Sequence, residues 1–151
     1  KKGILGDTVP LELNAKELVH RNNKNSELTV YGYTPMMVSV QCVQKTMDHC
    51  NHACVQYVLK DRYQKEFRGV CSCEFCYNTI YNTLPTSLLK EKEKAEKLGV
   101  KAYRLSFTTE TQQETEKIVR AFVDVYLRGQ KPDGQMQTEE TTKGHFQRGV
   151  E

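Results

Sequence analysis

The chain has 151 residues, of which 38% are hydrophobic and 27% charged, which fits a single ordinary domain or a fragment of one. Its formal net charge of +3 is too small to imply a nucleic-acid or anionic-membrane partner by itself. No stretch approaches the roughly 18 apolar residues that a bilayer-spanning helix needs, and no signal peptide is apparent. We therefore expect a cytoplasmic protein without membrane contact. Because it begins without Met, we also expect it to be cut from a longer polypeptide.

Residues 1–41 are expected to form a strand, a helix and a second strand. Apolar and polar residues alternate over 9–13, as in a half-buried strand. Asn14 can cap the following helix, and Glu17 completes a capping box with it. The second strand covers 28–40, with an interruption at its proline.

Residues 42–76 form a cysteine-rich insertion that we expect to be mostly loop. Apart from a strand-like piece at Val55–Leu59, followed by the polar turn KDRYQK, no sustained period is present. A loop of this length without a core of its own needs disulfides or a metal to order it.

Residues 77–129 return to regular elements, which we expect to follow the order strand, helix, strand, helix. The expected elements are a strand at Tyr77–Tyr81, a helix capped by Thr86 or Ser87 and ending at Leu98, a strand at Val100–Phe107, and a helix at Gln112–Leu127. Thr111 and Glu114 make a second capping box, and Gly99 and Gly129 stand where the helices stop. Residues 130–151 are a polar linker and a terminal segment.

Strands that alternate with helices at this spacing are typical of parallel βα units with crossover helices. About four such units can be placed along the chain. The predicted fold class is therefore α/β, a partial (half) TIM-like barrel of parallel βα units that carries the cysteine-rich loop insertion. Half a barrel leaves open sheet edges, so we expect self-association or packing against the remaining half of the parent barrel.

All six cysteines lie between Cys42 and Cys76, and this crowding suggests one site. The pair Cys73 and Cys76 has the C-x-x-C spacing that lets two thiolates bind one ion from a tight turn. A second pair could come from Cys42 with Cys50 or Cys54. Four thiolates suit either a tetrahedral zinc or an iron-sulfur cluster, and the spacing alone does not choose between them.

Other interpretations of the cysteines remain open. They could be small buried hydrophobic residues or, in an exported protein, three disulfides. His49 and His52 lie inside the cluster and are second-choice ligands, because a histidine in a polar loop is more often solvated. No convincing hydrolytic constellation is present, so the catalytic residues are unknown.

Several runs of the sequence, taken in order, resemble one known family. These runs are ELTVYGYTPMMVSVQC (27–42), LKDRYQKEF (59–67), CEFCYNTIYNTLPTSLL (73–89) and KGHFQRGVE (143–151). The chain resembles the carboxy-terminal half of the barrel region of the collagenase-like peptidase family, number thirty-two of the peptidases of unassigned catalytic type. The likeness covers nearly the whole chain.

The resemblance implies a bacterial or archaeal parent enzyme that acts as a protease on peptides or as an oxygen-independent hydroxylase of RNA or a quinone precursor. It also implies a 4Fe-4S cluster, for which the best matches to the ligands are Cys42, Cys50, Cys73 and Cys76, while Cys54 and Cys71 are left over. The isolated fragment is expected to be inactive.

Five residues are candidates to face a substrate. In a βα barrel the active site lies at the carboxyl ends of the strands, and Asn14, Tyr33 and Arg104 fall at or just beyond expected strands. His145 and Arg148 belong to the terminal run that the family resemblance covers.

The alternative function is a zinc-stabilised RNA- or protein-binding module without catalysis. In this alternative, coordination by four cysteines orders the loop. Basic residues of the insertion such as Lys60, Arg62, Lys65 and Arg68 would then contact RNA or another protein.

Overall fold

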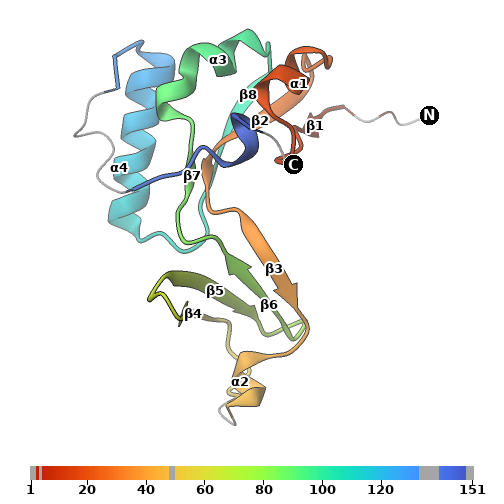
Figure 1. The fold of residues 1–151 in the computed structure, drawn as a ribbon, viewed down its shortest axis with the longest axis vertical. Coiled ribbons are helices and arrows are strands. Elements are labelled where there is room, and N and C mark those ends of the chain that lie inside the picture. The colour runs from red at the N-terminus through yellow and green to blue at the C-terminus, as the bar shows by residue number, and fades with distance from the viewer. Residues whose placement is uncertain (1–2, 4, 48–49, 133–139, 149–151) are drawn as a thin grey trace. The chain divides into compact units, whose positions relative to one another are not determined.

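A computed structural model describes residues 3, 5–47, 50–132 and 140–148 of the chain. The chain divides into two compact units (Figure 1). One unit joins residues 1–32 to residues 85–151, and the other consists of residues 33–84. We call them the discontinuous unit and the inserted unit. Among the described residues, no helix combines the length and the apolar character needed to cross a bilayer.

The discontinuous unit is built on a mixed sheet whose central strand is β2 (Ser26–Gly32). Strand β2 pairs in parallel with β1 (Asp7–Thr8) and β8 (Ala102–Ser106), and antiparallel with β7 (Thr86–Ser87). The end of β2 approaches β8 so closely that a Cβ on Gly32 would lie 2.5 Å from the carbonyl oxygen of Ser106. Glycine at this position therefore allows the two backbones to meet.

Short helices complete this unit. They are α1 (Ala15–Val19), the 3-10 turn η1 (Leu89–Glu91), α3 (Lys92–Lys97), α4 (Gln112–Phe122), the π-helical turn η2 (Val123–Leu127) and the 3-10 turn η3 (Gly144–Phe146). Both predicted capping boxes are confirmed, Asn14 with Glu17 and Thr111 with Glu114.

The hydrophobic core of the protein lies in the discontinuous unit. Apolar residues of β2 pack against residues of α1, α3 and α4, and Tyr31 of β2 meets the ring of Phe122 edge-on at 6.1 Å. The buried members are Val9, Leu18, Leu28, Val30, Tyr31, Leu88, Leu89, Ala95, Leu98, Ala121, Phe122, Val125 and Phe146. None of them belongs to the inserted unit, which must therefore be stabilised in another way.

The inserted unit is an antiparallel sheet with the strand order β3-β6-β5-β4. Its elements are β3 (Pro35–Ser39), the short helix α2 (Val43–Thr46), β4 (Val55–Lys60), β5 (Glu66–Ser72) and β6 (Tyr77–Tyr81). Asp61 closes the hairpin turn between β4 and β5, where its side chain accepts from the amides of Tyr63 and Lys65 at 2.8 and 2.9 Å. The predicted strands at Val55–Leu59 and Tyr77–Tyr81 and the polar turn are thus confirmed.

The α/β class is confirmed, but the described strands form a mixed sheet and an antiparallel sheet and close no barrel. The half barrel of parallel βα units is therefore not confirmed, because the parallel strand pairs in the described part of the chain are β1 with β2 and β2 with β8, and the other strand pairs there are antiparallel. The expectation that 42–76 is mostly loop holds only in part, since α2, β4 and β5 lie in this range and β4 and β5 form a hairpin of six consecutive residue pairs. The strand expected at 9–13 is wrong, because pairing ends after Thr8 apart from one bond from Val9 to Glu27.

Candidate metal centre

All six cysteines belong to the inserted unit, and none of them forms a disulfide. They come from three places in this unit. Cys42 directly precedes α2, Cys50 and Cys54 lie between α2 and β4, and the remaining three lie on β5 or in the turn that joins it to β6. The antiparallel pairing of β4 with β5 therefore brings sulfur atoms from distant parts of the sequence together.

The side chains of Cys50, His52 and Cys73 form a group in which the ligand atoms all lie within 4.8 Å of one another. Two thiolates bound to one tetrahedral ion at about 2.3 Å are about 3.8 Å apart, so the group is compact enough to share an ion. Cys73 is buried, while His52 is exposed and has a positive φ of 56°. This group could hold a metal ion, as the clustering of cysteines predicted.

A second close pair lies beside this group. The sulfur atoms of Cys42 and Cys71 are 3.8 Å apart, and both residues are buried. Cys71 stands on the central strand β5, opposite Val55 on one side and Asn78 on the other. Sequence reasoning left Cys71 out of the ligand set, although it lies at the end of β5, two residues before Cys73 of the turn.

The predicted ligands are thus only partly brought together. Cys50 and Cys73 share the compact group, and Cys42 pairs with Cys71 instead. Cys76 has a positive φ of 53°, and its thiol donates to the carbonyl oxygen of Cys73 at 3.6 Å, so the C-x-x-C turn is tight. Of the second-choice ligands, His52 belongs to the compact group, and His49 lies outside the described residues.

Burial, hydrogen bonds and neighbouring cysteines shift the pKa values of the buried thiols. Burial, together with the hydrogen bond that its thiol donates to Cys42, raises the pKa of Cys71 to about 11. Burial and the neighbouring Cys50 raise the pKa of Cys73, while the backbone amide of Lys45 lowers the pKa of Cys42. Thiolates this close together repel one another. A bound cation would remove this repulsion and release protons as it binds.

Two of the predicted substrate-facing residues lie in the discontinuous unit with partners of their own. The Asn14 side chain accepts from the amides of Lys16 and Glu17 at 2.9 and 3.1 Å and thereby caps α1. Arg104 lies within β8 and forms an ion pair with Glu27 of β2. The helix cap and the ion pair therefore explain the positions of both side chains without a substrate.

The other three candidates are distributed over both units. Tyr33 is buried in the inserted unit, with the guanidinium of Arg68 4.9 Å from the centre of its ring. His145 lies in η3 of the discontinuous unit and Arg148 follows it, and both are exposed. The structure therefore does not assemble the five predicted residues into a site within one unit.

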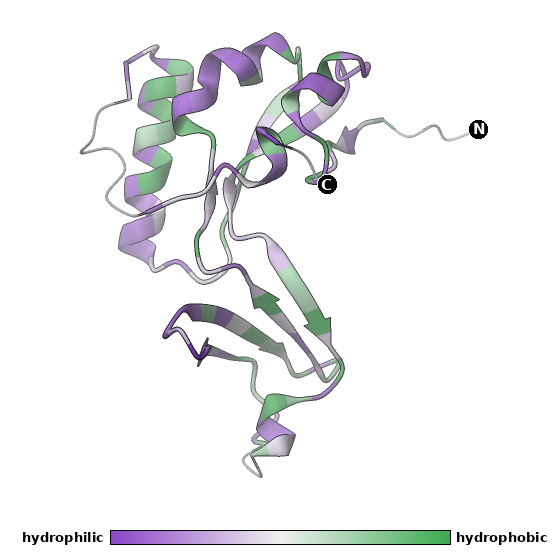
Figure 2. Ribbon diagram, in the orientation of Figure 1, coloured by the Kyte–Doolittle hydropathy of each residue, from purple (hydrophilic) through white to green (hydrophobic). Residues whose placement is uncertain are grey.

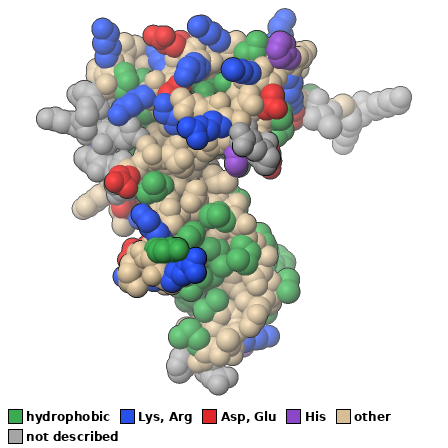
Figure 3. Space-filling view, viewed as in Figure 1, with side chains coloured by type: hydrophobic (Ala, Val, Ile, Leu, Met, Phe, Trp, Pro, Cys, Tyr) green, Lys and Arg blue, Asp and Glu red, His purple; other side chains and the backbone are tan. Residues whose placement is uncertain are grey.

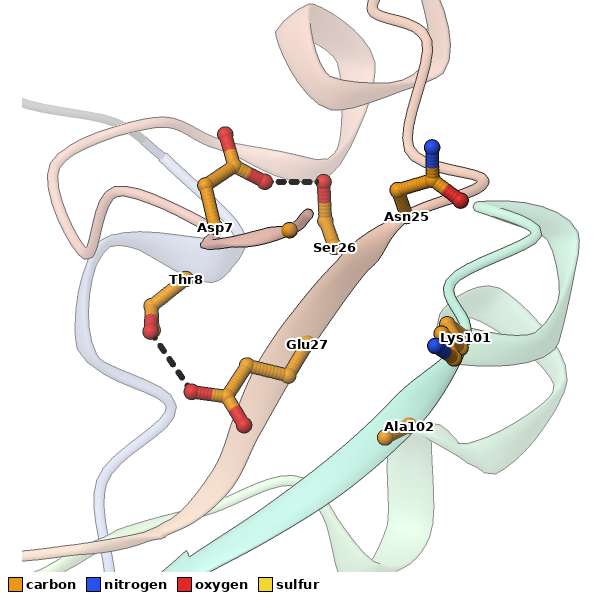
Figure 4. A pocket seen from close by; sticks show the side chains of 8 residues that line it. Asp7, Thr8, Asn25, Ser26, Glu27, Lys101 and Ala102 are labelled. Atoms are coloured by element: carbon orange, nitrogen blue, oxygen red, sulfur yellow. Dashed lines mark hydrogen bonds between the residues drawn. The ribbon is translucent and has the colours of Figure 1, made fainter. Parts of the chain in front are cut away.

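A hollow of about 400 Å³ in the discontinuous unit lies where β1, β2 and β8 begin (Figure 4). Its two carboxylates are already paired: Asp7 accepts from Ser26 at 2.5 Å, and Glu27 accepts from Thr8 at 2.7 Å (Figure 4). The hydrogen bond from Ser26 is the main reason that the pKa of Asp7 is lowered. Because ligands of parallel strands bind at the carboxyl ends, this hollow is the weaker candidate.

Comparisons with known proteins add no assignment, because no family model, no curated protein and no solved structure matches the chain. The argument for function therefore depends on the geometry of the cysteines.

Proposed function

We propose that the inserted unit is a metal centre with cysteine thiolates as its main ligands, and that the metal is a 4Fe-4S cluster. The observation that carries this proposal is the gathering of six cysteines, none of them in a disulfide, in the inserted unit. Among the described residues of the inserted unit, the buried hydrophobic side chains are Tyr33, Cys42, Cys71 and Cys73. A unit whose buried interior is largely cysteine gains little from apolar packing, so a metal would supply the missing stability.

The distribution of the sulfur atoms favours a cluster over a single ion. Among the described residues, one group of three potential ligands has all its ligand atoms within 4.8 Å of one another, and it consists of Cys50, His52 and Cys73. Cys42 and Cys71 form a separate pair. Together these four thiols and one imidazole exceed the four ligands of one tetrahedral ion, which favours a centre with more than one metal ion. The proposed ligands are Cys42, Cys50, Cys73 and Cys76, with Cys71 close enough to replace one of them.

The resemblance to the collagenase-like peptidase family supports the same metal and suggests the wider context. In this proposal the parent protein is an enzyme that acts as a protease or as an oxygen-independent hydroxylase of RNA or a quinone precursor. A 4Fe-4S cluster supplies electron transfer or substrate ligation when it is bound. The residues of this chain hold the cluster and exclude water from Cys42, Cys71 and Cys73, which are all buried. The half barrel of parallel βα units belongs to this proposal as well.

One observation favours the alternative, a zinc-stabilised module that binds RNA or protein. Cys50, His52 and Cys73 supply a compact set of three ligands of the type that zinc prefers. The basic residues expected to contact RNA or a protein partner lie on the hairpin of β4 and β5. Of these, Lys60 pairs with Glu66 at 3.0 Å, and the guanidinium of Arg62 lies 4.7 Å from the ring centre of Tyr63.

Metal analysis of the protein purified without oxygen tests the proposal. We expect about four irons and four inorganic sulfides per chain, with visible absorption that is lost in air. Cys73→Ser should abolish the absorption, while the exposed Cys54→Ser should retain it. Colourless protein with one zinc per chain would support the module instead, and protein without metal under either condition would contradict both.

A further inference from the structure

The thiols of Cys42 and Cys71 form a close pair that is separate from the compact group of three potential ligands. Their sulfur atoms are 3.8 Å apart, although the two residues lie 29 positions apart in the sequence, and neither is in a disulfide. A disulfide bond is about 2.0 Å long, so the two sulfurs need to approach each other by only about 1.8 Å to form one. Small rotations about the two Cα–Cβ bonds cover this distance.

Hydrogen bonds hold the backbone at both cysteines. Cys71 lies on β5, an inner strand of the sheet, and pairs with Val55 of β4 and Asn78 of β6. The carbonyl oxygen of Cys42 accepts from the amide of Thr46 at 3.1 Å and from its side-chain hydroxyl at 3.0 Å. The two sulfur atoms therefore lie side by side on two segments whose backbones are fixed.

The side chain of Asn78 ties these two segments to each other. Asn78 is the partner of Cys71 in the ladder between β5 and β6, and its Nδ2 atom donates to the carbonyl oxygen of Gln41 at 2.6 Å. Gln41 directly precedes Cys42. Because Asn78 is fully buried, this link is shielded from water, and it keeps the two thiols adjacent without the help of a metal ion.

From this geometry we propose that Cys42 and Cys71 are an oxidation site, at which a peroxide converts the two thiols to a disulfide. With hydrogen peroxide, the Cys42 sulfur attacks one peroxide oxygen, the O–O bond breaks, and Cys42 becomes a sulfenic acid while one water leaves. The Cys71 sulfur then attacks the Cys42 sulfur, the S–O bond breaks, and the thiol proton of Cys71 leaves with the hydroxyl group as a second water. The two thiols lose two electrons in total, and these reduce the peroxide to water.

Burial determines which disulfide persists once it has formed. Cys42 is 5% exposed and Cys71 is fully buried, so a small oxidant can reach Cys42, whereas a larger thiol such as glutathione has little access to the finished bond. The rival disulfide would join Cys50 to Cys73 within the compact group. Cys50 is only partly buried, so glutathione should reduce the rival bond more readily.

The consequence for the metal rests on the proposed function. Cys42 is one of the four proposed ligands, so the disulfide removes this ligand, and a bound metal in turn protects Cys42 from oxidation. The disulfide also closes a long loop between the start of α2 and β5, which restricts the unfolded chain. The inserted unit therefore has two alternative links, a metal when its thiols are reduced and a disulfide when they are oxidised.

Peptide mapping by mass spectrometry tests this proposal on the full chain, after a chelator has removed its metal. We expect one equivalent of hydrogen peroxide, followed by reduced glutathione, to leave Cys42 joined to Cys71 as the main disulfide. The melting temperature should then rise by at least about 5 °C. A main linkage between Cys50 and Cys73, or complete reduction by glutathione, would overturn the proposal.

The variant Cys71→Ser shows whether this pair causes the stabilisation. It should lose both the linkage and the rise in melting temperature, while Cys54→Ser, which alters an exposed thiol, should keep both. An equal rise in the two variants would refute the role of Cys71.

Uptake of the metal separates this proposal from the proposed function. The oxidised, unaltered chain should take up at least tenfold less cluster from ferrous iron and sulfide than the reduced chain. Equal uptake would refute the control of the metal by the disulfide. If the reduced chain takes up no cluster either, the proposed function is contradicted, while a mapped disulfide between Cys42 and Cys71 still confirms the oxidation site.

Discussion

At the scale of single residues, the buried thiol of Cys71 connects stability to pH. Its pKa is about 11 in the fold, against an ordinary value of 9.0, because burial disfavours the thiolate. As the pH rises, the unfolded chain therefore loses this proton before the folded chain does. The contribution of the neutral thiol to stability is fully present below pH 9 and is lost as the pH rises towards 11.

The corresponding prediction concerns the metal-free, reduced protein. Its melting temperature, followed by circular dichroism, should fall between pH 9 and 11, and the fall should be smaller in Cys71→Ala, which has no thiol to ionise. Cys54→Ala removes an exposed thiol and serves as the control that keeps the steeper fall. If Cys71→Ala and the unaltered protein show parallel curves, Cys71 does not titrate as described.

At the scale of elements, the capping box of α4 gives a prediction about stability. Thr111 Oγ1 accepts from the Glu114 amide at 3.3 Å, and Glu114 accepts from the Thr111 amide at 2.5 Å. Thr111→Ala removes the side-chain acceptor of the Glu114 amide, so it should lower the free energy of unfolding by about 1 kcal/mol. Thr115→Ala lies inside the same helix and should be neutral or stabilising, because alanine favours helix. Urea denaturation measures both, and an equal loss in the two variants would contradict the role of the cap.

The elements that could be predicted from sequence are those with local determinants. The helix at Gln112–Phe122 carries its own cap, and Gly99 and Gly129 adopt the positive φ expected at helix ends. The hairpin of β4 and β5 could not be predicted in full, because the sequence of β5, EFRGVCS, lacks a regular apolar alternation. Its strand forms because β4 and β6 bond to it on both sides. Such pairing is non-local and leaves little trace in a single strand.

The candidate site shows the same division between local and non-local information. The C-x-x-C spacing predicted that Cys73 and Cys76 occupy one tight turn, which is confirmed. The proximity of Cys42 to Cys71 depends on how the chain returns across the sheet. It therefore could not be predicted from the spacing of the cysteines in the sequence. The parallel βα units are not confirmed for a related reason. The order of strands and helices along the chain does not determine which strands become neighbours in a sheet.

At the scale of the whole molecule, the two compact units differ in what stabilises them. The hydrophobic core lies entirely in the discontinuous unit, whereas the interior of the inserted unit depends on cysteines. Removing the metal with a chelator should therefore increase hydrogen exchange in β4, β5 and β6 by a large factor, while β2 and β8 remain protected. Mass spectrometry of exchanged peptides measures this. A uniform increase across both units, or no increase in the inserted unit, would contradict the proposed role of the metal.

The inserted unit also exposes an apolar edge. Strand β3 lies at the edge of its sheet, and it is largely hydrophobic in Figure 2. Its Met36, Met37 and Val38 side chains are 62%, 55% and 64% exposed, and hydrophobic side chains gather on the visible face of this unit (Figure 3). The strand carries no charge. Two copies can therefore pair along β3 without like-charge repulsion, which is the self-association expected from the sequence.

Self-association along β3 can be tested by placing charges on this edge. Val38→Lys should shift the protein from dimer to monomer in sedimentation velocity, because a lysine on an edge strand opposes pairing with a second strand. Leu127→Lys is the matched control, since Leu127 is 78% exposed and lies in the discontinuous unit. Loss of the dimer in both variants would indicate nonspecific hydrophobic association, and a monomeric parent chain at all concentrations would exclude pairing along β3. Dimers that persist only in Leu127→Lys would identify β3 as the contact between copies.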